Sequence, residues 1–219
     1  MANGKKVGVL ISGRGSNLAA LIDACAADDF PAEVAVVISS RPDAAGLGFA
    51  EKAGIPAVAL DHSAFDGREA FEAELDATLR AHDIELVCLA GFMRLLTTGF
   101  VETWRDRMIN IHPSLLPAYP GVNIHERVAD DGVRITGCTV HYVRTDMDNG
   151  PIIAQSAVPV LSNDTADTVA ARVLAAEHRL YPLALRMVAD GTVRVSGERV
   201  VFSGAETEAP PLFSPQPTR

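Results

Sequence analysis

The sequence has few cysteines and no surplus of positive charge, and both shortages restrict its possible functions. Its three cysteines, Cys25, Cys88 and Cys138, lie far apart and lack the CxxC spacing of metal or redox sites. We expect them to be reduced, buried side chains of a cytoplasmic protein. The formal net charge of -9 argues against a nonspecific nucleic-acid or membrane surface, while it still allows a local basic pocket.

Long apolar segments are also missing. No run approaches the roughly 20 apolar residues that a membrane-spanning helix needs. Residues 1–6 form a short polar segment and a strand pattern begins at Val7, so we expect no signal peptide. The 219 residues, of which 48% are hydrophobic, are instead typical of a soluble globular protein with a full core.

The first half of the sequence alternates strand and helix signals. Short apolar runs predict buried strands at 6–12, 34–38, 57–60, 86–90 and 107–111. Helical periodicity separates the first four of them, at 16–27, 44–53 and 68–81. Strands that alternate with helices indicate parallel βαβ units, so we predict an α/β fold with a doubly wound, mostly parallel open sheet.

The second half changes character. Two strands, at 135–144 and 151–160, are joined by a loop with an Asn149-Gly150 turn, which predicts an antiparallel portion of the same sheet. A long helix at 165–189 follows, and Pro182 should kink or interrupt it. A hairpin at 193–201 turns at Gly197. We predict a single domain over 1–205, with a Rossmann-like half at about 1–105 and a second half at about 106–205, before a proline-rich tail at 206–219.

Three polar side chains stand out among turn residues. Asn110 and His112 are two residues apart, so they lie on the same side of an extended chain. Asp148 lies in the glycine-containing loop between the two later strands. An amide, an imidazole and a carboxylate supply what acyl transfer to a neutral amine needs: an oxyanion donor, a proton acceptor and an orienting acid. A turn aspartate is usually structural, and the sequence does not show that Asp148 meets His112.

Two further loops should lie at the same edge of the sheet, beyond the carboxyl ends of the strands. Residues 13–17 combine two glycines with the start of a helix, whose free N–H groups can bind a phosphate. Their spacing matches neither GxGxxG nor a Walker motif, and the alternative is a tight turn with Ser16 as the N-cap. Residues 91–96 mix apolar bulk with one arginine, which suits either a flat heteroaromatic ligand or a loop that merely packs.

Other histidines carry weaker signals. His125 and His141 are candidates to join His112 around a metal, but their spacing matches no familiar signature and no cysteine or acid pair completes the set. We therefore predict no metal site. The pair Glu177-His178 on the long helix would ordinarily belong to a solvated face.

The chain resembles the phosphoribosylglycinamide (GAR) formyltransferases, the folate-dependent transformylases of de novo purine synthesis. The resemblance covers nearly everything from Lys6 to Gly191. It is carried by five motifs in the right order, at Ile11–Leu18, Leu89–Arg94, Ile109–Pro117, Gly137–His141 and Asp148–Ile153. Arg14 and Asn123 depart from some relatives, which carry a smaller polar residue and a histidine there.

The resemblance implies site residues by position. Gly15, Ser16 and Asn17 would bind the ribonucleotide phosphate and Glu177 its ribose, which makes the first half the nucleotide-binding half. The folate site would take in Arg68, Met93, Arg94, Leu95, Leu96, Val101, Val143 and Asp148, with the loop 143–148. Asn110, His112 and Asp148 would be the catalytic trio, and the Leu116–Pro117 bond is expected to be cis.

The implied reaction is direct formyl transfer from 10-formyltetrahydrofolate, a co-substrate, to the ribonucleotide amine, without metal, nucleic acid or membrane, in a cytoplasmic monomer or homodimer. Three alternatives stay open. A methionyl-tRNA formyltransferase would need a further tRNA-binding domain and a basic surface. A formyl-folate hydrolase usually carries an N-terminal regulatory domain. A binding module on an inactive scaffold would have lost a catalytic side chain, and all three are present.

Overall fold

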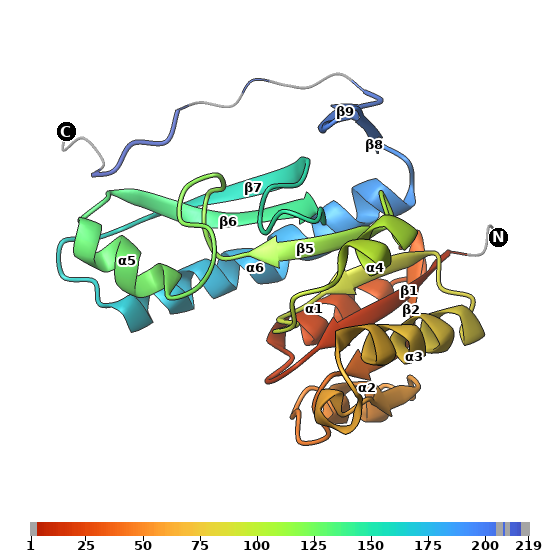
Figure 1. Cartoon of the computed structure of the whole chain (residues 1–219). Coiled ribbons are helices and arrows are strands. Elements are labelled where there is room, and N and C mark those ends of the chain that lie inside the picture. The colour runs from red at the N-terminus through yellow and green to blue at the C-terminus, as the bar shows by residue number, and fades with distance from the viewer. Residues whose placement is uncertain (1–3, 205–207, 209–210, 216–219) are drawn as a thin grey trace.

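The computed structural model describes residues 4–204, 208 and 211–215 (Figure 1). Seven strands form one sheet in the order β3-β2-β1-β4-β5-β6-β7. These strands are β1 (Lys5–Ile11), β2 (Ala32–Ser39), β3 (Ala57–Ala59), β4 (Leu86–Leu89), β5 (Met108–His112), β6 (Ile135–Tyr142) and β7 (Ile152–Pro159). A separate hairpin consists of β8 (Val193–Ser196) and β9 (Arg199–Phe202). All nine strands lie where the sequence predicts them, to within two residues at most ends.

The helices are α1 (Ser16–Cys25), α2 (Leu47–Lys52), α3 (Arg68–Ala81), α4 (Thr98–Thr103), α5 (Ile124–Asp131) and α6 (Ala166–Ala189), with a short 3-10 turn η1 (His62–Ala64). The bounds of α3 agree with the sequence prediction at both ends. The short helices α4 and α5 were not predicted. One signal for α4 was present, because Thr97 caps its N-terminus by accepting a hydrogen bond from the Phe100 N–H.

The sheet confirms the predicted fold class. Strands β1 to β5 pair in parallel, whereas β6 pairs antiparallel with both β5 and β7. The chain builds outward from β1 to β3 and then returns to place β4 on the other side of β1. This reversal makes a switch point between β1 and β4, the place in open α/β sheets where ligands bind.

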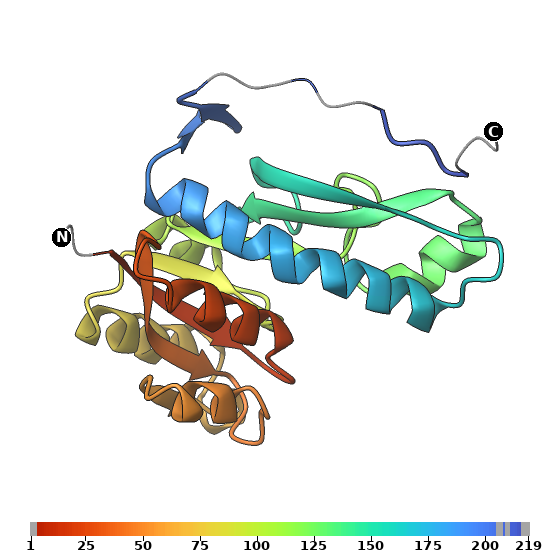
Figure 2. The ribbon, with the colours of Figure 1, turned by 180° about the vertical axis from the view of Figure 1, so that it is seen from behind.

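Two hydrophobic cores cover the two faces of the sheet (Figures 1 and 2). One core packs α1, α5 and α6 against one face, with Leu21, Val128 and Val173 among its fully buried members. The other packs α3 and α4 on the opposite face around Leu75 and Trp104. The alternation along β1 explains the division, because Val9 belongs to the first core and Leu10 to the second.

Helix α6 runs from Ala166 to Ala189 through Pro182, so the predicted interruption is wrong. A proline inside a helix removes one backbone hydrogen bond. The helix continues because residues on both sides of Pro182 are anchored in the first core, among them Tyr181 and Leu185. Its start is fixed by a capping box between Thr165 and Thr168.

The C-terminal segment beyond Gly204 lies largely outside the described residues. The proline-rich tail predicted at 206–219 is described only at 208 and 211–215, where no helix or strand occurs. Among the described helices, none combines the length and the apolar character that crossing a membrane requires.

We predict that Tyr181→Phe destabilises the fold by about 1–2 kcal/mol. The fully buried Tyr181 hydroxyl donates to the carbonyl oxygens of Leu89 (3.0 Å) and Ile109 (3.1 Å), tying α6 to β4 and β5. Phenylalanine would leave both carbonyls without this donor. The measurement is the free energy of unfolding in urea. Tyr119→Phe is the control, because its hydroxyl makes an exposed contact with Asp131, and equal losses in both variants would contradict the argument.

Candidate active site

The loops after β1 and β4 are joined directly at the switch point. The Ser12 N–H donates to the Gly91 carbonyl at 3.2 Å, and the Ser12 hydroxyl accepts from the Met93 N–H at 2.9 Å. The same hydroxyl lies 2.7 Å from that of Ser40, at the end of β2. Two of the three loops that the sequence places at one edge therefore share a hydrogen-bonded base.

The loop after β1 is built around Gly15. Its φ of 76° lies in the left-handed region, and a Cβ there would come within 2.6 Å of the Gly46 Cα. Gly15, not Ser16, occupies the N-cap position of α1, so the alternative of a Ser16 cap is wrong. No side chain caps this end of the helix. The first-turn N–H groups of α1 therefore face the loop without a side-chain acceptor, as an anion site requires.

Asn17 and Glu177 meet behind this loop, although 160 positions separate them. The Asn17 amide donates to a Glu177 carboxylate oxygen at 2.7 Å. Glu177 is 6% exposed, so the expectation of a solvated face is wrong, and burial raises the pKa of its carboxyl. The amide oxygen of Asn17 is buried without a hydrogen-bond partner in the described structure. A polar ligand with a donor group would satisfy it.

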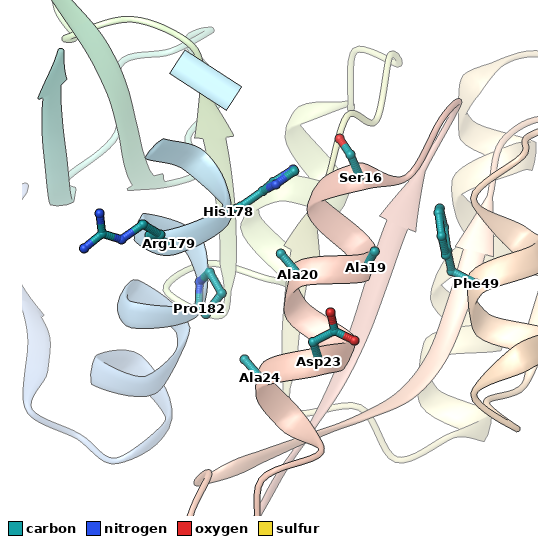
Figure 3. Close-up of a pocket in the computed structure, with 9 residues that line it drawn as sticks. All are labelled: Ser16, Ala19, Ala20, Asp23, Ala24, Phe49, His178, Arg179 and Pro182. Atoms are coloured by element: carbon teal, nitrogen blue, oxygen red, sulfur yellow. The ribbon is translucent and has the colours of Figure 1, made fainter. Parts of the chain in front are cut away.

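A cavity of about 680 Å³ continues from Ser16 along the groove between α1 and α6. Small side chains of α1, such as Ala20, face Pro182 of α6 across it. Figure 3 shows His178 directed toward α1, whereas Arg179 points to the other side of α6. The buried Nε2 of His178 has no hydrogen-bond partner among the described residues. The groove is therefore continuous with the predicted ribonucleotide site at Ser16, and it offers a ligand one polar atom without a partner, the Nε2 of His178.

Asn110 on β5 is oriented by a histidine on the neighbouring strand. The Nδ1 of His141 lies 2.9 Å from the Tyr142 carbonyl oxygen, to which it donates, so Nε2 is left as an acceptor. The Asn110 amide nitrogen lies 3.2 Å from that Nε2. Burial lowers the pKa of His141, which keeps the ring neutral and able to accept. His141 thus fixes which way the Asn110 amide points.

His112 and Asp148, whose meeting the sequence leaves open, are in contact. The Nδ1 of His112 lies 3.4 Å from one Asp148 carboxylate oxygen, and the other oxygen accepts from the Gly121 N–H at 2.8 Å. Asp148 takes a φ of 55°, a left-handed conformation that a short polar side chain tolerates. The Nε2 of His112 lies 2.9 Å from the Tyr119 carbonyl oxygen. Both ring nitrogens of His112 therefore lie near carboxylate or carbonyl oxygens.

The loop after His112 is held by residues that sequence reasoning missed. The Thr139 hydroxyl donates to the Ser114 carbonyl at 2.7 Å and accepts from the Leu116 N–H at 3.0 Å. Gln155 on β7 donates to the Leu116 carbonyl at 2.9 Å. The Leu116–Pro117 bond is cis, as expected. Thr139 lies in the Gly137–His141 motif, so the sequence carried a signal for its position, whereas no local sequence pattern marks Gln155.

The predicted folate residues differ in how much surface they offer. Met93 and Leu95 are 71% and 63% exposed, whereas Val101 is buried in the second core and has little side chain left to contact a ligand. Arg68 is exposed at the start of α3, and three members are partly exposed: Arg94, Leu96 and Val143. Glu72 of α3 anchors the end of the loop 91–96 by accepting hydrogen bonds from the N–H and the hydroxyl of Thr97. These folate contacts stay predictions.

Two of the three histidines considered for a metal site have other partners, whereas the buried Nδ1 of His125 has no hydrogen-bond partner among the described residues. His112 and His141 each use both ring nitrogens in the contacts described above. Within residues 4–204, 208 and 211–215, no group of three or more histidine, cysteine, aspartate or glutamate side chains is arranged to hold a metal ion. Burial raises the pKa of Cys138 and of Cys25 to about 12, so neither is a thiolate at neutral pH.

Comparison with known proteins agrees with this geometry. The model of the formyl transferase family matches residues 5–185, which is most of the chain. The chain belongs to the formyl transferase family. The phosphoribosylglycinamide formyltransferase of Escherichia coli is 45% identical over 187 residues, covering 85% of this chain and 88% of that protein. This similarity confirms the resemblance inferred from the motifs.

Solved structures of the family share the fold closely. The glycinamide ribonucleotide transformylase 1 of Symbiobacterium toebii has 46% sequence identity and a TM-score of 0.89, over 92% of this chain and 95% of that chain. The trifunctional purine biosynthetic protein adenosine-3 of Bos taurus is 50% identical over 190 residues. This formyl transferase chain spans 87% of its own length in that match but 19% of the bovine protein.

We predict that Gly15→Ala destabilises this formyl transferase by about 1–3 kcal/mol, because alanine is strained at a positive φ and its Cβ collides with the Gly46 backbone. Gly13→Ala is the matched control, since a Cβ at Gly13 meets no atom within 4 Å. The measurement is the thermal unfolding midpoint of both variants. A Gly15 variant that melts with the Gly13 variant would show that the loop is not constrained as described.

Proposed function

We propose that this chain transfers the formyl group of 10-formyltetrahydrofolate to the amine of phosphoribosylglycinamide, giving formylglycinamide ribonucleotide and tetrahydrofolate. The observation that carries the proposal is the contact of Asp148 with His112 at the end of β5, on the strand where Asn110 is held by His141. The names of the Escherichia coli and Symbiobacterium toebii relatives support the choice of acceptor. The enzyme acts on small molecules in the cytoplasm, as a monomer or homodimer.

The ribonucleotide binds along α1 and α6. Its phosphate accepts hydrogen bonds from the first-turn N–H groups of α1, at Gly15, Ser16 and Asn17. The Glu177 carboxylate accepts from the ribose hydroxyls, and a ribose hydroxyl satisfies the buried Asn17 oxygen. The folate lies between the loop 91–96 and the loop 143–148, so the two substrates meet above the carboxyl end of β5.

The reaction is an acyl transfer through a tetrahedral intermediate. The neutral glycinamide nitrogen attacks the formyl carbon, and a new carbon–nitrogen bond forms as the carbonyl oxygen becomes an oxyanion. The Asn110 amide has two N–H bonds, of which one is donated to His141 and the other to this oxyanion. The bond to the folate nitrogen then breaks, and the proton lost by the amine is delivered to that nitrogen.

His112 and Asp148 manage charge and proton. Protonated His112 stabilises the oxyanion electrostatically. Its Nε2–H, which lies against the Tyr119 carbonyl oxygen in the free protein, turns to donate to the oxyanion. The Asp148 carboxylate balances the imidazolium and, through a water, passes the amine proton toward the leaving nitrogen. Holding both substrates together contributes about 7–11 kcal/mol to the lowering of the barrier.

We predict that Asp148→Asn lowers kcat by roughly a hundredfold or more while the protein keeps its fold. Asparagine still accepts the hydrogen bond from the Gly121 N–H through its amide oxygen, but it places no negative charge beside His112. The measurement is steady-state formyl transfer with both substrates varied. Binding of the ribonucleotide should change little, because its site lies on α1 and α6.

The control for the loss of one charge is Asp131→Asn, whose carboxylate contacts the Tyr119 hydroxyl on the exposed side of α5. This variant should turn over at the wild-type rate. Near-normal turnover of the Asp148 variant would remove Asp148 from the mechanism and leave the proposed chemistry without its acid.

A further inference from the structure

Arg144 occupies an unusual position at the start of the loop that carries Asp148. Its side chain is 8% exposed, although it is an arginine at the end of a strand. The guanidinium donates to the Glu198 carboxylate at 2.8 Å, to the Asp106 carboxylate at 2.7 Å and to the Val143 carbonyl at 3.0 Å. Two of these partners lie close in sequence to β5 and β6, whereas Glu198 belongs to the separate hairpin.

Glu198 is placed by the turn of the β8–β9 hairpin. Ser196 pairs with Arg199, so Gly197 and Glu198 form a two-residue turn, and Gly197 takes the positive φ of 63° that such a turn requires. The second carboxylate oxygen of Glu198 accepts from the Arg105 guanidinium at 2.5 Å. The hydrogen bond with Arg144 lowers the pKa of Glu198, so the pair stays charged at neutral pH.

The hairpin and the Asp148 loop are separated by space rather than by packed side chains. A cavity of about 740 Å³ lies between them, lined on one side by Asp148 and Gly150 and on the other by Glu198 and Val200. Figure 1 shows β8 and β9 beyond the end of the sheet at which β6 turns into β7. The hairpin packs against the first core through Val195 and Val200, and its turn reaches the base of the loop through the hydrogen bond of Glu198 with Arg144.

We propose that Glu198 is a positioning residue for formyl transfer: by clamping Arg144 it fixes the base of the loop 143–151 and so holds Asp148 against His112. The inference rests on the proposed role of Asp148. The hairpin thereby has a function in catalysis, since its turn sets the position of the Asp148 side chain, 50 residues earlier in the chain. Charge-assisted hydrogen bonds of this kind combine strength with directional control.

The test compares Glu198→Ala with Glu102→Ala. Both remove a carboxylate that accepts from Arg105, but within the described part of the chain only the Glu198 carboxylate of the two also contacts Arg144. Glu198→Ala should lower kcat by about tenfold, less than the roughly hundredfold cost of an ångström-scale misplacement of a reacting group. Glu198→Gln, which keeps one oxygen acceptor for Arg144, should recover part of the loss. Glu102→Ala should match the wild type.

A second readout separates positioning from general loss of stability. Amide hydrogen exchange in residues 143–151 should quicken in the Glu198 variant and not in the Glu102 variant, with the rest of the main sheet unchanged. Combined with Asp148→Asn, the Glu198 change should lower kcat no further, because it acts through Asp148.

Three results would overturn the inference. They are equal kcat and exchange in the Glu198 and Glu102 variants, a full tenfold loss that persists in the Asp148→Asn background, and loop exchange that is unchanged in the Glu198 variant. Failure of the proposed function would look different, since the wild-type protein itself would then give no folate product that depends on the ribonucleotide.

Discussion

The reversal of strand order beside β1 is the constraint on which the site depends. Because β2 lies on one side of β1 and β4 on the other, the loops that leave β1 and β4 diverge above the same edge of the sheet. Ser12 then joins the two loops at their base through backbone and hydroxyl hydrogen bonds. The proposed ribonucleotide loop and the proposed folate loop therefore lie on neighbouring strands as a consequence of topology, before any side chain is considered.

Hydrogen bonds between buried polar groups fix the orientation of the side chains in the site. His141 is 2% exposed, and its two ring nitrogens are used to fix the Asn110 amide against β6. Glu177 is held by Asn17 in the same manner on the other side of the switch point. Buried polar groups are costly when unpaired, so each of these pairs restricts its members to one geometry. This restriction is what preorganisation of an acyl-transfer site requires.

Much of the fold followed from local patterns, because continuous apolar runs and helical periodicity report burial directly. Asn110 and His112 were also readable, since two residues on one strand share a side. Contacts between distant segments were not. The meeting of Asp148 with His112 depends on a left-handed backbone at Asp148 and on the Gly121 N–H, and the clamp on Arg144 depends on a hairpin 54 residues later. The predicted interruption of α6 at Pro182 was wrong because tertiary packing overrides the local preference of proline.

The most direct test of the account is formyl transfer by the purified protein. Phosphoribosylglycinamide and 10-formyltetrahydrofolate would be supplied together, and the deformylated folate would be followed by absorbance with and without the ribonucleotide. We expect folate product that appears only when the ribonucleotide is present. Equal release of folate without the ribonucleotide would indicate hydrolysis, and no release in either case would indicate another acceptor or a binding role; both results would contradict the account.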